Sequence, residues 1–262
     1  MVMYHHLFAG RKREAILQNL SEGIVGCTGN AARLLADVGL LAGSGRYASA
    51  TFLVTTAKEE MAKAYILLDA CRVDLSRHEN VLRRLSRAFY DHIAKHAYYK
   101  IHRLPNIVSM EALKQLWEAE TTLRWVAGDP ESGEPDMPHA NYFHRELPLY
   151  VDFSDYTDAW IIPDDKSHRS QFEELIGLDV MKSTNKMLDR LRRAEHQGLF
   201  TPAVLDTLNA SLRDHYFNES VSLQEVTNHY ERLAVRVSRS TNVAVDAILR
   251  SPLAAVPLYH FA

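Results

Sequence analysis

The sequence has few of the residues that interrupt regular structure or crosslink a chain. It contains 11 glycines and 9 prolines in 262 residues, which argues against a loop-rich β architecture and against extensive disorder. The two cysteines, Cys27 and Cys71, lie in expected helices and form no CxxC pair. This usage fits a reducing compartment, so we expect a cytoplasmic protein without a structural disulfide.

Long hydrophobic runs and a dominant charge are also missing. No run approaches the ~20 apolar residues that cross a bilayer, and the first residues lack the apolar core of a signal peptide. We therefore expect no membrane partner. The net charge is −3, so no global basic field indicates a nucleic-acid binder. Hydrophobic residues make up 47% of the chain, enough for a sizeable core in one or two domains.

Helical periodicity is the main signal that is present. From Tyr47 to about Val73, apolar residues recur at helical spacing and predict a helix with one buried face. A helix over about 28–41 precedes it across a short turn, so the two should form an antiparallel hairpin. Gly23 and Gly26 should interrupt a shorter helix over 11–22. Further helices are expected over 77–103, 109–126, 169–197, 202–215 and 222–250.

Residues 129–165 differ sharply in composition from the rest. They hold ten Asp or Glu against one Arg, with five prolines, and predict a long acidic connection with a short extended segment at 147–153. The expected fold class is all-α, with this irregular acidic insertion and additional C-terminal helices. The expected divisions are an N-terminal extension (1–27), a helical bundle (28–128), the acidic loop (129–168) and a C-terminal helical region (169–262). The apolar tail after 250 should dock on the body or on another subunit.

Charged residues lie unusually close to the buried face of the helix over 47–73. Glu59 and Lys63 are four residues apart and able to pair, and Glu60 lies about 60° from the centre of the apolar face. Unpaired charge in a core is costly. The alternative is an ordinary solvated Glu–Lys pair.

The helix over 77–103 is rich in cations and aromatic rings. It carries seven Lys or Arg against two acids, and four histidines. Such a surface can contact phosphates and stack bases, and the residues expected to bind RNA are Arg83, Arg84, Tyr99, Lys100 and Arg103. The alternative is a solvated basic face that the acidic segment balances and shields.

Arg87 and His92 in this stretch can act together on a phosphodiester. A guanidinium holds phosphate oxygens bidentately, and an imidazole can move the proton of a ribose 2′-hydroxyl. No metal or cofactor is then required. The spacing alone is common, because Arg72–His78 and Arg190–His196 also fit Arg-x(4–6)-His. His92 and His96 have the spacing of helical zinc ligands, but no third ligand has a clear relation to them.

Taken together, these segments resemble a known family. The A-x-E-E-x-x-K of Ala57 to Lys63, the H-x-x-K of His92 and Lys95, and LYVD (149–152) followed by W-x-x-P (160–163) occur in order over about 28–165. This combination is similar to the abortive-infection protein AbiV family of the HEPN superfamily.

The resemblance implies a four- or five-helix HEPN bundle, usually a dimer, that acts in defence against phage. Many HEPN members are metal-independent endoribonucleases whose Arg-x(4–6)-His motifs meet across the dimer. Carried over, Arg87 would bind phosphate and His92 would be the acid/base. The supporting residues would be Glu59, Glu60, Lys63, Lys95 and His96. Expected partners are RNA, a second copy of the chain and a phage-encoded activator protein.

One position departs from the superfamily pattern. The residue after the arginine is commonly polar, and here it is Ala88. Two hypotheses therefore stay open. The first is a ribonuclease toxin that halts translation by cleaving RNA. The second is a non-catalytic module that blocks translation by binding RNA, ribosomal components or a phage protein. A purely structural helical module is a third.

Overall fold

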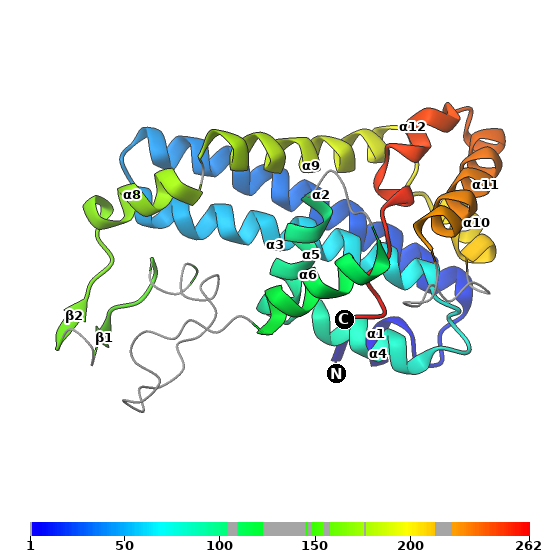
Figure 1. The fold of residues 1–262 in the computed structure, drawn as a ribbon, viewed down its shortest axis with the longest axis horizontal. Coiled ribbons are helices and arrows are strands. Elements are labelled where there is room, and N and C mark those ends of the chain that lie inside the picture. Colours follow the sequence, from blue (N-terminus) through cyan, green and yellow to red (C-terminus); the bar gives the residue numbers. More distant parts are fainter. Residues whose placement is uncertain are drawn as a thin grey trace.

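A long helical hairpin forms the spine of the protein. The computed structural model describes residues 2–103, 109–122, 145, 148–154, 158–175, 177–212 and 222–262. Helices α2 (Arg13–Gly43) and α3 (Tyr47–Arg72) run antiparallel and pack along their length (Figure 1). The turn between them includes Gly45 at φ +73°, a conformation that glycine adopts without strain. The predicted hairpin is confirmed.

The expected interruption at Gly23 and Gly26 is wrong, because α2 is one continuous helix of 31 residues. Gly23 lies where α2 approaches α3 closely: a Cβ there would lie 2.8 Å from Leu67 Cδ1. A glycine inside a helix costs up to about 1 kcal/mol of propensity. The close packing of the two helices offsets that cost, so the glycine marks a contact rather than an end.

By length and composition alone, α2 could cross a membrane, which differs from the expectation that no segment approaches this limit. One such helix is weak evidence for a membrane-spanning segment, because a core helix of a soluble protein meets the same criteria. Leu20, Ile24 and Ala31 of α2 are fully buried in the main hydrophobic core. Burial against protein therefore accounts for the apolar character of that face.

The single helix expected over 77–103 is also wrong. The structure has α4 (Glu79–Ala88) and α5 (His92–Arg103), separated by a three-residue turn. Asp91 ends that turn: its Oδ1 accepts a hydrogen bond from the Ala94 backbone N–H at 2.9 Å, as an N-cap does. Apolar spacing continues through the break, so periodicity alone does not reveal it. Helices α1 (Val2–Leu7) and α6 (Met110–Thr122) complete the helices of the N-terminal half of the chain that the structure describes.

Two short strands form a small hairpin away from the spine, at the left of Figure 1. Strand β1 (Asp152–Ser154) pairs antiparallel with β2 (Ala159–Ile161), with Phe153 opposite Trp160. Part of the predicted extended segment at 147–153 is therefore extended. Most of the acidic stretch, including 129–144, lies outside the described residues. The fold class is all-α, as predicted.

The C-terminal half adds five helices and a 3₁₀ turn to the described part of the chain. One long helix was expected over 169–197, but α8 ends at Leu175 and α9 begins at Leu178. The helix expected over 222–250 ends at Thr241, because Asn242 adopts φ +59°. The bounds are α8 (Asp165–Leu175), α9 (Leu178–His196), α10 (Pro202–Leu212), α11 (Leu223–Thr241), α12 (Val245–Leu249) and η2 (Pro252–Ala254).

These C-terminal helices bury their apolar faces in the same core as the hairpin. Leu191 of α9, Leu208 of α10 and Leu233 of α11 belong to one buried cluster with Leu20 of α2 and Met61 of α3. Figure 1 shows α9 lying along the hairpin and α10 to α12 grouped at one end. The region after residue 178 thus packs directly on the spine.

The final segment docks on the body, one of the two expected outcomes, through a buried polar cluster. Asp69 of α3 accepts hydrogen bonds from the Tyr98 hydroxyl at 2.8 Å and the Leu258 backbone N–H at 2.7 Å. Asp69 also pairs with Arg72, whose guanidinium donates to the Pro252 carbonyl at 3.0 Å. Both charged side chains are fully buried, so each depends on the other for compensation.

Candidate functional site

Glu59 is the centre of a charged cluster between α3 and α5. Its Oε1 lies 2.8 Å from His92 Nδ1, its Oε2 lies 2.7 Å from Lys95 Nζ, and its side chain is only 4% exposed. Lys95 Nζ also lies 3.2 Å from His92 Nδ1. In the tautomer whose Nδ1–H donates to the Glu59 carboxylate, Nε2 is the ring nitrogen without a proton. Proton transfer to or from a ligand would then use Nε2.

Lys95 supplies the positive charge that makes a buried Glu59 tolerable. Burial lowers the pKa of Lys95, while Glu59 opposes that shift by favouring the ammonium form. The Lys95 side chain is 4% exposed, and a buried carboxylate without such a partner would be strongly destabilising. The cluster is therefore a paired unit that fixes the His92 ring against α3.

Arg145, the single arginine of the acidic stretch, also reaches this cluster. Its Nε lies 3.7 Å from Glu59 Oε1, and its guanidinium lies over the Phe52 ring at 5.9 Å. The sequence patterns gave Arg145 no role, although it lies only four residues before the LYVD segment (149–152) of the resemblance. One cation among ten acids is the signal that could have indicated a specific contact.

Glu60 and Lys63 form a second pair next to the cluster. Their side chains meet at 2.6 Å, and the ammonium lies 5.2 Å from the centre of the Phe89 ring. The expected Glu59–Lys63 pairing is thus wrong, because Glu59 turns to α5 instead. Burial, together with the negative charge of Glu60, raises the pKa of the Cys27 thiol to about 12. A thiol with so high a pKa is a poor nucleophile.

Arg87 and His92 lie at the two ends of the turn between α4 and α5. Arg87 is exposed in the last turn of α4 and makes no side-chain hydrogen bond or ion pair with a described residue. His92 is the first residue of α5, with 29% of its side chain exposed. The turn therefore presents a solvent-facing guanidinium close in sequence to an imidazole that Glu59 holds.

The residues expected to bind RNA make contacts within the protein. Arg84 donates to the Tyr259 carbonyl at 3.1 Å and Arg103 to Ser183 Oγ at 3.4 Å. Tyr99 is 4% exposed and hydrogen-bonded to Thr184, so its ring does not face solvent for base stacking. The remaining two form ion pairs: Arg83 with Glu79, and Lys100 with Glu120.

Two further sequence expectations concern His96 and metal binding. His96 is 5% exposed on α5, inside the bundle rather than on its surface. Within the described ranges, no three His, Cys, Asp or Glu side chains are grouped so that they could hold a metal ion.

An all-α bundle with an Arg-x₄-His motif at the turn between two of its helices has the features of a HEPN domain. The family model for AbiV matches residues 19–180, which is more than half of the chain. The protein belongs to the AbiV family and is an abortive-infection HEPN protein. No curated protein and no solved structure was found to match it. The match ends within α9, so α10 to α12 lie beyond it.

Proposed function

We propose that this protein is a metal-independent endoribonuclease that halts translation in phage-infected cells. The observation that carries the proposal is the Glu59-held imidazole of His92 at the turn that exposes Arg87. General acid–base catalysis needs an oriented imidazole, and phosphate binding suits an unengaged guanidinium. In this proposal the protein acts on RNA in the cytoplasm, and a phage-encoded activator protein switches on its cleavage activity.

The chemistry follows from these two side chains. His92 Nε2 takes the proton of a ribose 2′-hydroxyl, and the oxygen attacks the adjacent phosphorus. The bond to the 5′-oxygen breaks, leaving a 2′,3′-cyclic phosphate and a 5′-hydroxyl after that oxygen is protonated. Arg87 holds the phosphate oxygens as negative charge develops on them. In a homodimer, the His92 side chains of the two copies supply the base and the acid.

A non-catalytic module is the second candidate, and Ala88 is the observation that favours it. The residue after Arg87 is an alanine, 4% exposed against the core, where the superfamily commonly has a polar side chain. No polar side chain directly follows Arg87 to help hold a phosphate. In this alternative, the protein blocks translation by occupying RNA, a ribosomal component or a phage protein.

The test compares the wild type with His92→Ala, Arg87→Lys and His196→Ala on end-labelled RNA in EDTA, with and without extract from infected cells. We expect cyclic phosphate ends from the wild type and a loss of about 10²–10⁴-fold in His92→Ala. Arg87→Lys keeps the charge but loses bidentate contact, so it should raise KM and lower kcat. His196 belongs to the Arg190–His196 match on the exposed side of α9, and its replacement should change nothing.

The same samples separate the two candidates. RNA that stays intact in every lane, from a protein that still arrests cell growth, would favour the non-catalytic module. Equal cleavage by the wild type and a folded His92→Ala variant would exclude His92 as the catalytic acid/base. Analytical ultracentrifugation at the assay concentration should show a dimer. A monomer with full cleavage activity would exclude the mechanism in which the two copies supply the base and the acid.

A further inference from the structure

Arg145 brings a second guanidinium to the site of Glu59 and His92. Its Nε lies 3.7 Å from Glu59 Oε1, and the same oxygen lies 2.8 Å from His92 Nδ1. Because Arg145 and His92 contact one oxygen, they are neighbours in space. The imidazole therefore has a guanidinium beside it in addition to Arg87, which lies at the other end of the α4–α5 turn.

The Glu59 carboxylate is unfavourable for an anionic substrate. A phosphodiester is negatively charged, and a carboxylate next to the imidazole repels it. Lys95 compensates the charge of Glu59, but its side chain is only 4% exposed, so a ligand from solvent has little access to its ammonium group. Arg145 compensates the same carboxylate, and 25% of its side chain is exposed, similar to the 29% of His92. Of these two cations, Arg145 is the one that a phosphate can reach.

Two contacts to α3 fix the Arg145 side chain in this position. The guanidinium lies 5.9 Å from the centre of the Phe52 ring, within the range of a cation–π contact. Phe52 and Glu59 are two helical turns apart, so they lie on the same face of α3. The Glu59 contact, at 3.7 Å, is an ion pair too long for a hydrogen bond. Neither contact uses the five N–H donors of the guanidinium, whose planar arrangement suits bidentate binding of phosphate oxygens.

We propose that Arg145 is a substrate-binding residue, which holds an oxygen of the same phosphodiester that Arg87 holds and His92 acts on. This inference rests on the proposed function. The residue directly after Arg87 is the buried Ala88, so that position supplies no second donor to the phosphate. Arg145 supplies one from another part of the chain. Two guanidinium groups on one phosphodiester stabilise the negative charge that develops on its oxygens when the 2′-hydroxyl attacks.

Binding of a short single-stranded 2′-O-methyl RNA to the full chain tests this role without cleavage, because the attacking hydroxyl is blocked. Fluorescence anisotropy at physiological salt gives the affinity. We expect Arg145→Gln to weaken binding about 10–100-fold, since a hydrogen bond to a charged group is lost. Arg145→Lys keeps the ion pair with Glu59 but not the bidentate geometry, so its affinity should fall between those of Arg145→Gln and the wild type. On cleavable RNA, Arg145→Gln should lower kcat/KM at least as much as it lowers affinity.

A double variant shows whether the two arginines share one phosphodiester. If they do, Arg87→Gln/Arg145→Gln should lose less affinity than the product of the two single losses, because removing either guanidinium already releases the phosphate that the other holds. Losses that multiply independently would overturn the shared phosphodiester.

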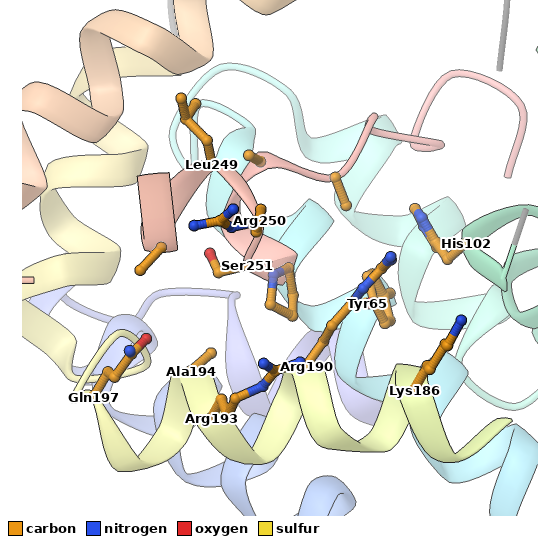
Figure 2. Close-up of a pocket in the computed structure, with 14 residues that line it drawn as sticks. Tyr65, His102, Lys186, Arg190, Arg193, Ala194, Gln197, Leu249, Arg250 and Ser251 are labelled. Carbon is orange, nitrogen blue, oxygen red and sulfur yellow. The ribbon is translucent and has the colours of Figure 1, made fainter. Parts of the chain in front are cut away.

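Two control variants remove the same charge elsewhere. Arg169 is the matched control, because it also lies over an aromatic ring of α3, that of Tyr47 at 5.7 Å, and pairs with a carboxylate, that of Glu173 at 2.9 Å. Arg190 belongs to a separate group of cations, which lines a cavity between α9 and the α12–η2 segment (Figure 2). Arg190→Gln therefore measures the non-specific attraction of RNA to positive charge. Arg169→Gln and Arg190→Gln should both bind the 2′-O-methyl RNA nearly as the wild type does.

The outcomes separate the role of Arg145 from the proposed ribonuclease. An affinity that falls no more in Arg145→Gln than in Arg190→Gln overturns the role of Arg145, whether or not the wild type cleaves RNA. Tighter binding or faster cleavage by Arg145→Gln also overturns it, because Arg145 would then obstruct the site. A wild type that binds RNA without cleaving it, and loses affinity in Arg145→Gln, would exclude the ribonuclease and keep Arg145 as a phosphate contact. A wild type that binds no RNA overturns both.

Discussion

Three consecutive charged residues on α3 are almost fully buried, and each has a different partner. Lys58, Glu59 and Glu60 are between 4% and 9% exposed. Successive residues of a helix point about 100° apart, so Lys58 faces the Tyr99 ring at 5.6 Å while Glu59 faces α5 and Glu60 pairs along α3. Charges placed this way cost stability, and such a cost is usually retained where a site needs them.

Lys58 allows that cost to be measured. Burial, with the nearby charge of Arg103, lowers the pKa of Lys58 from 10.5 to about 8. Between those values the unfolded chain binds the proton more readily, so stability rises with pH through that window. Below pH 8 the penalty is complete. Lys58→Met should therefore stabilise the protein by up to about 3 kcal/mol at pH 7, and the gain should disappear above pH 10.5.

Urea unfolding of wild type and Lys58→Met at pH 7 and pH 10.5 measures this difference directly. Lys182→Met is the control, because Lys182 is exposed on α9 and should change stability little at either pH. A gain of equal size at both pH values would mean that Lys58→Met acts through packing and not through charge.

At this scale the sequence predicts residue types better than their contacts. The A-x-E-E-x-x-K and H-x-x-K patterns lie on α3 and α5, and the structure brings Glu59 of the first into contact with His92 and Lys95 of the second. The pairing of Glu59 was wrong, because helical spacing makes Lys63 available but says nothing of His92 and Lys95 on another helix. Arg145 was missed for the same reason: 86 positions separate it from Glu59 in the numbering, and local patterns carry no information over that range.

At the scale of elements, two of the three breaks missed in the sequence, and the one wrongly expected, have identifiable causes. Asp91 caps α5 although apolar spacing runs through the turn, and Asn242 ends α11 in a left-handed conformation. Gly23 gives the opposite error, because its missing side chain serves packing against Leu67. Propensity describes one helix at a time, whereas the glycine at position 23 is decided by packing against the neighbouring helix.

Alanine substitutions along α2 test this explanation. A Cβ at Gly26 meets no atom within 4 Å, so Gly26→Ala should stabilise the protein by about 0.5–1 kcal/mol through helix propensity. Gly23→Ala gains the same propensity but forces the buried Leu67 to move, at a cost of about 1–3 kcal/mol. We therefore expect no gain or a net loss there, measured by denaturant unfolding of both variants side by side. An equal gain at both positions would show that Leu67 has room to shift.

At the scale of the whole molecule, the buried pair Asp69–Arg72 connects the spine to the last residues of the chain. The tail supplies the Leu258 N–H to Asp69 and the Pro252 and Leu253 carbonyls to Arg72. Both groups thus gain these hydrogen bonds only when the tail is docked. Pro252, Ala254 and Ala255 of the tail also line a cavity beside α9, so docking of the tail completes both the core and that cavity.

Removing residues 252–262 should therefore destabilise the protein far more than loss of an exposed tail would. Asp69 and Arg72 would lose buried hydrogen-bond partners, and breaking a buried ionic network costs about 3–5 kcal/mol. For a chain of this size that corresponds to a fall in Tm of roughly 6–20 °C. Adding Asp69→Asn and Arg72→Met to the truncated chain removes both charges and leaves an amide oxygen for the Tyr98 hydroxyl, so part of the loss should be recovered. A truncated chain as stable as the full one, or one that the two substitutions destabilise further, would show that the tail does not hold the buried pair.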